Sequence, residues 1–321
     1  MDDTHQLQGL KAALITPTTV RYIKLGPAGT WFKHALSNNF IELGHAAVSH
    51  EMAQAADPTA LRAAFVAAGA EANATAFANE ILAFTTLPET ALWITFERGL
   101  MWWAFAEPEL VDLPRAANDL PHGVRGRRLV SPWRCDDAAG QPLRIESLSG
   151  GLTSLASYRR SICRVKFEDH AVRRINSIPS PLVLKAAAAR EACVSVTAEM
   201  IAQLHPSDFE LLIDLIFAQS GWTRASALGG QQADVDLVLV QRATGERAFV
   251  QVKSRADRLI FEDYLRRYRE SRGVTRMFFA CHSPEGEWPA CEADVAVWSG
   301  ETLASQAVDA GLFAWLTERT R

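Results

Sequence analysis

The fold of the last third of the chain is decided by three stretches: residues 207–222 (SDFELLIDLIFAQSGW), 233–240 (ADVDLVLV) and 247–256 (RAFVQVKSRA). The first stretch has apolar residues at helical spacing, which predicts a helix over residues 208–220 with one buried face and Ser207 as its cap. The other two are short apolar runs separated by Thr244-Gly245. That pattern is typical of two strands joined in a β-hairpin.

Further helices and strands are predicted beyond the hairpin. A helix is predicted over residues 260–271, strands over 276–281 and 294–298, and closing helices within 302–319. The alternation of helices and strands predicts an α/β domain with a central mixed sheet over residues 205–321.

Polar residues interrupt the two hairpin strands where those strands come together. Asp236 begins one strand, and Gln251 and Lys253 lie two apart on the other, so their side chains share a face. In an antiparallel hairpin the start of one strand lies beside the end of the other, which brings Asp236 close to Lys253. Phosphodiester hydrolysis needs this combination, because oxygen ligands bind Mg²⁺ and a lysine can orient water and stabilise charge on the phosphate.

The same segment resembles the Mrr-type restriction endonucleases of the PD-(D/E)XK nuclease superfamily. The likeness covers roughly residues 207–300 and rests on the Phe-Glu helix, the small-apolar-Asp motif and Gln-x-Lys. It implies Glu210, Asp236, Gln251 and Lys253 as site residues, with Asp236 and Gln251 on Mg²⁺ (or Mn²⁺) and Glu210 in a supporting role. The usual glycine before Val235 is replaced by Asp234, which we interpret as a turn residue.

Lysine usage also draws attention to one position. Only six of the 33 basic residues are lysines, and Lys253 is the last of them. Six arginines lie between residues 258 and 276, and we expect Arg266 and Arg267 to contact DNA phosphates. The alternative for these arginines is a solvated helix face in an arginine-rich protein.

Residues 1–165 predict a separate α+β domain with a substantial β component, and residues 166–204 a helical connector. An aromatic hairpin over 92–105, a preceding strand and a short helix near Trp31 make this domain faintly similar to PUA-like domains, including the EVE type that reads modified bases. Aromatic walls beside a basic rim hold an extruded base, so candidate DNA contacts are Trp31, Trp102, Trp103, Arg125, Arg127 and Arg128. Tryptophans in a small β core are the plainer interpretation.

Composition sets the outer limits. The 321 residues carry a net charge of −4, which excludes a globally basic nucleic-acid binder. Five cysteines without a CxxC pair argue against disulfides or a four-ligand zinc site. No signal-peptide pattern or membrane-spanning run is present, so we expect a cytoplasmic protein without a membrane partner. P-loop, GxGxxG and GxSxG motifs are absent.

Together these features predict a Mg²⁺-dependent endonuclease of the type IV, modification-dependent kind, serving in restriction or phage defence. Its substrate would be double-stranded DNA, with or without modified bases, and a one-site chain is expected to act as a homodimer. Two alternatives stay open: a catalytically inactive DNA-binding or defence adaptor that kept the nuclease fold, and a nuclease acting on RNA or single strands.

Overall fold

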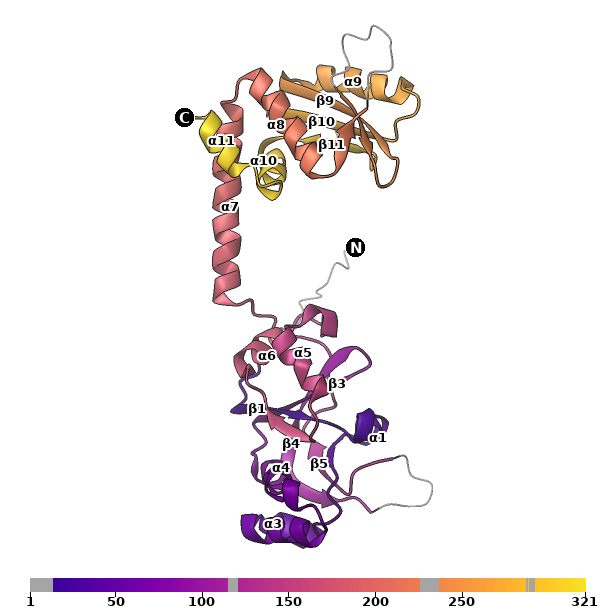
Figure 1. Cartoon of the computed structure of the whole chain (residues 1–321), viewed down its shortest axis with the longest axis vertical. Coiled ribbons are helices and arrows are strands. Elements are labelled where there is room, and N and C mark those ends of the chain that lie inside the picture. Colours follow the sequence, from indigo (N-terminus) through magenta and orange to yellow (C-terminus); the bar gives the residue numbers. More distant parts are fainter. Residues whose placement is uncertain (1–13, 115–120, 226–236, 287, 289–291) are drawn as a thin grey trace, which may run out of the picture. The chain divides into compact units, whose positions relative to one another are not determined.

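The computed structural model describes residues 14–114, 121–225, 237–286, 288 and 292–321. The chain divides into two compact units, 1–181 and 182–321, which are described separately (Figure 1). Asp236 and Asp234 lie outside the described residues. Among the described helices, none combines the length and the apolar character that crossing a bilayer requires.

The first unit is built on a sheet whose described strands run in the order β2-β5-β4-β3-β1-β6. The pairing is antiparallel except between β1 and β3, so the sheet is mixed. The strands are β1 Thr19–Ile23, β2 Phe40–Leu43, β3 Ala91–Glu97, β4 Leu100–Asp112, β5 Arg125–Leu129 and β6 Ile162–Arg164. The helices are α1 Phe32–Asn38, α2 His50–Ala55, α3 Pro58–Ala67, α4 Ala74–Thr86, α5 Gly150–Thr153 and α6 Glu168–Ile175.

Both faces of this sheet are covered by apolar clusters. Alternation along β3 sends Trp93 into one cluster, with Phe84 of α4, and Leu92 and Ile94 into the other. The second cluster includes Ala171 and Ile175 of α6. Helix α6 therefore belongs to the first unit, and the unit ends at Pro181 instead of the expected residue 165.

The second unit contains a mixed sheet in the order β11-β10-β9-β8-β7 among the described residues. Strands β9, β10 and β11 are parallel to one another, and β7 and β8 continue the sheet antiparallel. The strands are β7 Trp222–Arg224, β8 Leu237–Gln241, β9 Arg247–Ala256, β10 Arg276–Pro284 and β11 Val295–Trp298. The helices are α7 Pro181–Ala202, α8 Pro206–Gln219, α9 Arg258–Glu270, α10 Gly300–Asp309 and α11 Phe313–Arg319.

Helices cover the two faces of this second sheet. One cluster joins Val250 and Val252 of β9 to α8, α10 and the end of α7, and the other joins Phe249 to α9 (Figure 1). The predicted mixed α/β architecture is confirmed. One detail differs: α8 begins at Pro206, where the fixed proline φ suits a first helical turn, and its cap is His205, whose ring accepts from the Ser207 N–H at 3.4 Å.

Candidate functional site

Strand β9 is the central strand of the second sheet and carries the sequence-predicted amide and lysine. It pairs antiparallel with β8, with Leu237 opposite Val250, and parallel with β10, with Phe279 opposite Gln251 and Cys281 opposite Lys253. Both neighbours hold the β9 backbone by ladder hydrogen bonds, so the strand is a fixed platform for its side chains. The predicted partner Asp236 is the residue before Leu237 and lies outside the described residues.

Gln251 and Lys253 lie on the face of β9 that also carries Phe249, which is the α9 side of the sheet. The Gln251 side chain is fully buried, and its Nε2 donates to the carbonyl of Val252 at 3.3 Å. Lys253 is only partly buried, and its Nζ lies 5.2 Å from the centre of the Tyr264 ring on α9. The strand thus presents a buried amide followed by an ammonium at the rim of the domain.

A surface cavity of about 460 Å³ surrounds Lys253, and its other walls are Leu259, Ile260, Asp263 and Tyr264 of α9. The Tyr264 ring is contacted from two sides, by Lys253 and by the Arg267 guanidinium 5.0 Å from its centre. These cation–π contacts hold both cations next to the cavity. The cavity combines the apolar side chains of Leu259 and Ile260 with one lysine and one carboxylate.

Asp263 is a candidate site residue that the sequence pattern did not single out. Its carboxylate pairs with Arg267 at 2.8 Å and with Arg266, one helical turn along α9. In the sequence it counts only as one acid among several on a charged helix. The signal that identifies it is its spacing from Arg266 and Arg267, because residues three and four apart meet on a helix surface.

The two arginines predicted to contact DNA are therefore engaged within α9. Arg266 is 68% exposed and Arg267 38% exposed. Both remain at the surface near Lys253, and Asp263 neutralises part of their charge. Their phosphate contacts stay a prediction.

Glu210 keeps its supporting role as a prediction. It is an exposed residue of α8, the helix that packs on the Val250 and Val252 side of β9, whereas Lys253 lies on the α9 side. No hydrogen bond or ion pair between described residues joins Glu210 to Gln251 or Lys253. Its neighbour Phe209 instead packs edge-on against His282, with 4.8 Å between the ring centres.

His282 follows Cys281 on β10 and is a second polar group near the end of the central strands. Its Nδ1 lies 2.8 Å from the Ser283 hydroxyl, and its buried Nε2 has no hydrogen-bond partner among the described residues. Burial, followed by the nearby Arg255, lowers the pKa of His282 below its ordinary value. The neutral imidazole is therefore the stable form in the folded chain.

Within the described ranges, no cluster of three or more histidine, cysteine, aspartate or glutamate side chains could hold a metal ion. The predicted ligands Asp236 and Gln251 supply a carboxylate and an amide oxygen, a donor set that suits Mg²⁺. Gln251 fits that role in one respect: its side chain is held in place by complete burial and by the Val252 contact.

In the first unit, the aromatic residues proposed to hold a base are largely occupied. Trp102 and Trp103 point to opposite faces of β4, as predicted, and each face is covered by a cluster. The Trp102 indole donates to the Glu97 carbonyl at 3.2 Å and meets the Phe32 ring edge-on at 5.1 Å. Trp31 fills a slot beside two glycines: a Cβ at Gly26 or Gly44 would lie 2.6 or 2.9 Å from its ring.

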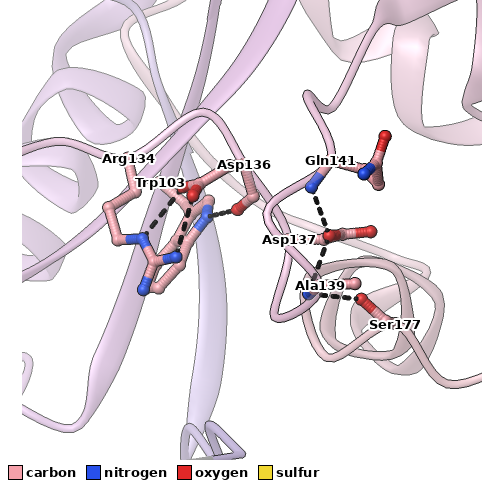
Figure 2. Close-up of polar contacts among 7 residues, drawn as sticks. All are labelled: Trp103, Arg134, Asp136, Asp137, Ala139, Gln141 and Ser177. Carbon is pink, nitrogen blue, oxygen red and sulfur yellow. Dashed lines mark hydrogen bonds and ion pairs between the residues drawn. The ribbon is translucent and has the colours of Figure 1, made fainter. Parts of the chain in front are cut away.

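Figure 2 shows why Trp103 cannot stack on a base in this structure. The ring is 5% exposed, and its indole N–H donates to the Asp136 carbonyl at 2.9 Å. The Arg134 guanidinium lies 5.0 Å from the ring centre and is itself held by two hydrogen bonds to the Asp136 carboxylate, at 2.9 and 3.0 Å. Trp103 is a core residue, so its predicted contact with an extruded base is corrected.

The basic strand β5 divides its arginines between core and solvent. Arg127 is fully buried and donates to the carbonyls of Glu107, Phe84 and Ala106 at 2.6, 3.0 and 3.0 Å. Arg125 is also buried and donates to the Val48 carbonyl. The prediction that these two arginines contact phosphates is therefore wrong for this conformation, because their guanidinium groups bind the protein's own backbone.

Burial also affects the pKa of the Arg127 guanidinium. It lowers the pKa of Arg127 to about 10, so the group remains charged at neutral pH. Arg128 points the other way: it is exposed, and its guanidinium lies 5.1 Å from the Phe40 ring centre. Strand alternation counted from the buried Leu129 gives the same division, because Arg125, Arg127 and Leu129 lie on one face of β5 and Arg128 lies on the other.

A cavity of about 250 Å³ in the first unit was not predicted. Its lining includes aromatic rings, a lysine, a carboxylate and a hydroxyl, from Tyr22, Lys24, Phe32, Thr95, Phe96 and Glu97. Trp102 lies behind this lining, where it supports Phe32 and the Glu97 backbone. The unit therefore has a partly polar, aromatic-walled hollow beside the tryptophans that the sequence singled out.

Comparisons with known proteins address the second unit. Residues 201–279 match the Mrr_cat family model, described as a restriction endonuclease. The matched range contains α8, β9 with Gln251 and Lys253, and α9. Residues 201–279 thus match a restriction-endonuclease domain of the Mrr type, the likeness that the sequence motifs predicted.

Two further comparisons concern the whole chain. A solved structure, "DNA modification-dependent restriction endonuclease AspBHI", is similar at 12% sequence identity and a TM-score of 0.26, over 76% of this chain and 74% of that chain. No curated protein matches the sequence. The PUA-like likeness of the first unit stays a prediction.

Proposed function

We propose that the chain is a Mg²⁺-dependent DNA endonuclease that acts in modification-dependent restriction or phage defence. One observation carries the proposal: in a domain of the restriction-endonuclease class, Gln251 and Lys253 lie on one face of the central strand, beside a cavity large enough for part of a DNA backbone. Asp236 enters the site as a prediction from the sequence.

The roles of the residues follow from their chemistry. Asp236 and Gln251 would hold Mg²⁺, for which Mn²⁺ can substitute; when bound, the ion polarises the scissile phosphate and lowers the pKa of water. Lys253 lies at the rim of the cavity, where its ammonium can orient a water molecule and stabilise the charge that develops on the phosphate. Tyr264 keeps that ammonium in place through its ring.

The experiment is plasmid cleavage with Mg²⁺ by the parent chain and by Asp236→Ala and Lys253→Ala. We expect each variant to lose about 100-fold or more in rate, the size of effect that follows loss of a charge-stabilising group. Lys185→Ala, which removes an exposed lysine of α7, is the matched control and should cut normally. If both site variants cut as fast as the parent, the assignment fails.

The same assay tests the alternatives. A chain that binds DNA but neither cuts it nor binds Mg²⁺ or Mn²⁺ through Asp236 would be an inactive adaptor with a nuclease fold. Faster cutting of RNA or single-stranded DNA in a substrate panel would reassign the substrate.

Modification dependence is supported by the cavity at Tyr22, Phe32 and Phe96. Aromatic walls stack on an extruded base, and Lys24 and Glu97 supply the charged groups that could read its edge. Glycine is favoured at position 29 because its φ of +75° lies in the left-handed region, and a Cβ there would also displace the Glu97 carboxylate. We expect Glu97→Gln to reduce any preference between modified and unmodified cytosine in binding assays, while the rate on its best substrate changes less.

We also propose a homodimer, because one nuclease site per chain cuts one strand at a time. Leu182 and Leu184, on opposite sides of the first turn of α7, are 75% and 56% exposed, so the start of this helix presents apolar side chains in more than one direction for a partner chain to cover. Light scattering after gel filtration should give twice the chain mass for the parent. The double variant Leu182→Glu, Leu184→Glu should give the mass of one chain.

A further inference from the structure

The first unit contains a second cavity, of about 290 Å³, between α4 and the edge of the sheet formed by β1 and β6. Its lining is unusually basic and includes Arg21 of β1, Arg160, and Arg164 of β6. Asn79 of α4 and Tyr158 add an amide and a phenol. None of the residues singled out for DNA binding by the sequence pattern lies in it.

Two of these arginines are neighbours on adjacent strands. In the antiparallel pairing of β1 with β6, Arg21 is directly opposite Arg164. Side chains of directly opposite residues lie on the same face, and like charges there destabilise a sheet. Burial and the proximity of Arg164 lower the pKa of Arg21. The free protein therefore holds two positive charges together at an energetic cost.

The acidic groups nearby cancel only part of this charge. Glu168 pairs with Arg164 at 2.7 Å and also accepts from the Thr19 hydroxyl. Glu80 lines the cavity but is buried, with one oxygen accepting from the Ser161 and Ile162 amides and the other 2.8 Å from His45 Nε2. Three arginines thus face two carboxylates that already have partners.

Arg21 keeps unused hydrogen-bonding capacity. It is partly buried, and its Nε is fully shielded from solvent without a hydrogen-bond partner among the described residues. A buried donor without an acceptor is costly, and guanidinium groups bind the oxygens of phosphate in pairs. Arg160 and Arg164 are exposed, so the cavity can be reached by a phosphate that is part of a long polymer.

We propose that the cavity lined by Arg21, Arg160 and Arg164 binds a backbone phosphate of DNA and anchors the first unit on its substrate. The choice of DNA as the source of the phosphate rests on the proposed function; the phosphate chemistry rests on the cavity itself. The site belongs to a different unit from Gln251 and Lys253, and it shares no lining residue with the aromatic cavity.

The first experiment measures binding of a DNA duplex by fluorescence anisotropy in EDTA, over a range of salt concentrations, for the full chain. Arg21→Gln and Arg164→Gln should each weaken binding about tenfold at low salt and reduce the slope of log K against log salt by about 1. Arg144→Gln is the matched control: this arginine of the same unit is 62% exposed and outside the cavity, and its removal should change affinity less than twofold.

The second experiment uses inorganic phosphate and thermal unfolding. Phosphate should raise the Tm of the parent and of Arg144→Gln, but not of Arg21→Gln. In phosphate-free buffer Arg21→Gln should be at least as stable as the parent, because it removes the opposed charge. This result would also show that the variant folds.

The outcomes separate cleanly. If phosphate fails to raise the parent's Tm and both DNA slopes are unchanged, the site does not bind phosphate. If phosphate stabilises the parent but the DNA slopes are unchanged, the ligand is a small phosphate compound and the DNA assignment is overturned. DNA binding is measured in EDTA, where metal-dependent cleavage is stopped. The test of the phosphate site therefore stays valid even if the chain proves unable to cut DNA.

Discussion

The two units place their charged residues in opposite ways. Among the described residues, the first unit buries five charged side chains, those of Glu42, Glu80, Arg125, Arg127 and Asp137, whereas the second unit buries none and has only Thr197 and Gln251 as buried polar residues. Arginines of the second unit that form ion pairs do so at the surface, as Arg258 does with Glu262 at 2.6 Å on α9 and Arg190 with Asp309 at 2.8 Å between α7 and α10.

The cause of the difference is how each backbone is satisfied. In the second unit the buried backbone groups pair within the ladders of β8, β9 and β10. In the first unit, β4 and β5 pair with a register shift between Ala106 and Leu110, and Arg127 binds the carbonyls of Ala106 and Glu107 at that irregularity. An arginine cluster in a sequence therefore indicates a nucleic-acid surface only after strand alternation has assigned its members to a face.

The strongest test of this contrast is Arg127→Met. Methionine fills part of the volume but leaves three buried carbonyl oxygens without donors, so we expect a loss of about 3 kcal/mol in the free energy of unfolding. Urea denaturation followed by tryptophan fluorescence measures it. Arg128→Met, the exposed neighbour on the same strand, should change the value by less than about 0.5 kcal/mol. Equal effects at the two positions would contradict the proposed division of the strand.

A second test is Glu80→Gln, which keeps the size of the side chain but removes its charge. The amide can still accept from Ser161 and Ile162 but loses the charge-assisted contact with His45, so a loss of about 1–2 kcal/mol is expected. Because Glu80 also joins α4 to the amides of Ser161 and Ile162, and an amide oxygen accepts more weakly than a carboxylate, hydrogen exchange of the Ile162 amide should accelerate. Unchanged exchange of the Ile162 amide would show that the charge of Glu80 does not stabilise this part of the first unit.

A third test compares the pH response of the two units. Burial raises the pKa of Glu42 above 4.5 and lowers that of His282 below 6.5. Between pH 4.5 and the raised pKa, Glu42 therefore keeps a proton in the folded chain that it loses in the unfolded chain. Its contribution to the free energy of unfolding falls as pH rises through the raised pKa. The folded second unit binds fewer protons than the unfolded chain below pH 6.5, so His282 loses stability as pH falls.

Denaturation curves over this pH range, with Glu42→Gln and His282→Gln as the two variants, check the opposite signs. Each substitution should flatten the slope of one unit only. A common direction for both would show that other groups control the response.

The smallest expected effect is that of Arg266→Ala on stability. This arginine is 68% exposed, and its pairing with Asp263 is a surface ion pair on one helix, so the free energy of unfolding should change by less than about 0.5 kcal/mol. Chemical denaturation in low and high salt measures it. A loss of unfolding free energy as large as that for Arg127→Met would contradict the contrast between buried charges in the first unit and surface charges in the second.

Much of the second unit could be predicted from sequence because its elements are regular. The predicted strand over 276–281 and helix over 260–271 fall within a few residues of β10 and α9. The shared face of Gln251 and Lys253 follows from alternation alone. The position of Glu210 did not follow, because helical periodicity gives the buried face of α8 but not the side of the sheet on which that face packs.

The first unit was less predictable, for a different reason. Strands β2 and β6 are four and three residues long, too short for a periodic pattern to be recognised. Residues 166–182 look like a connector because of their mixed charge, yet Ala171 and Ile175 of α6 are buried. The basic cavity depends on the register of β1 against β6, which places Arg21 beside a residue 143 positions later.

The parallel pairing of β9 with β10 has a consequence for how the protein is made. A ribosome releases the chain from its N-terminus, so Lys253 is synthesised before residues 276–284, which supply one of its two strand neighbours. Until that segment has left the ribosome, β9 lies at an unfinished sheet edge and its lysine has no fixed position. The timing of translation thus delays the completion of the β9 platform until residues 276–284 have been made.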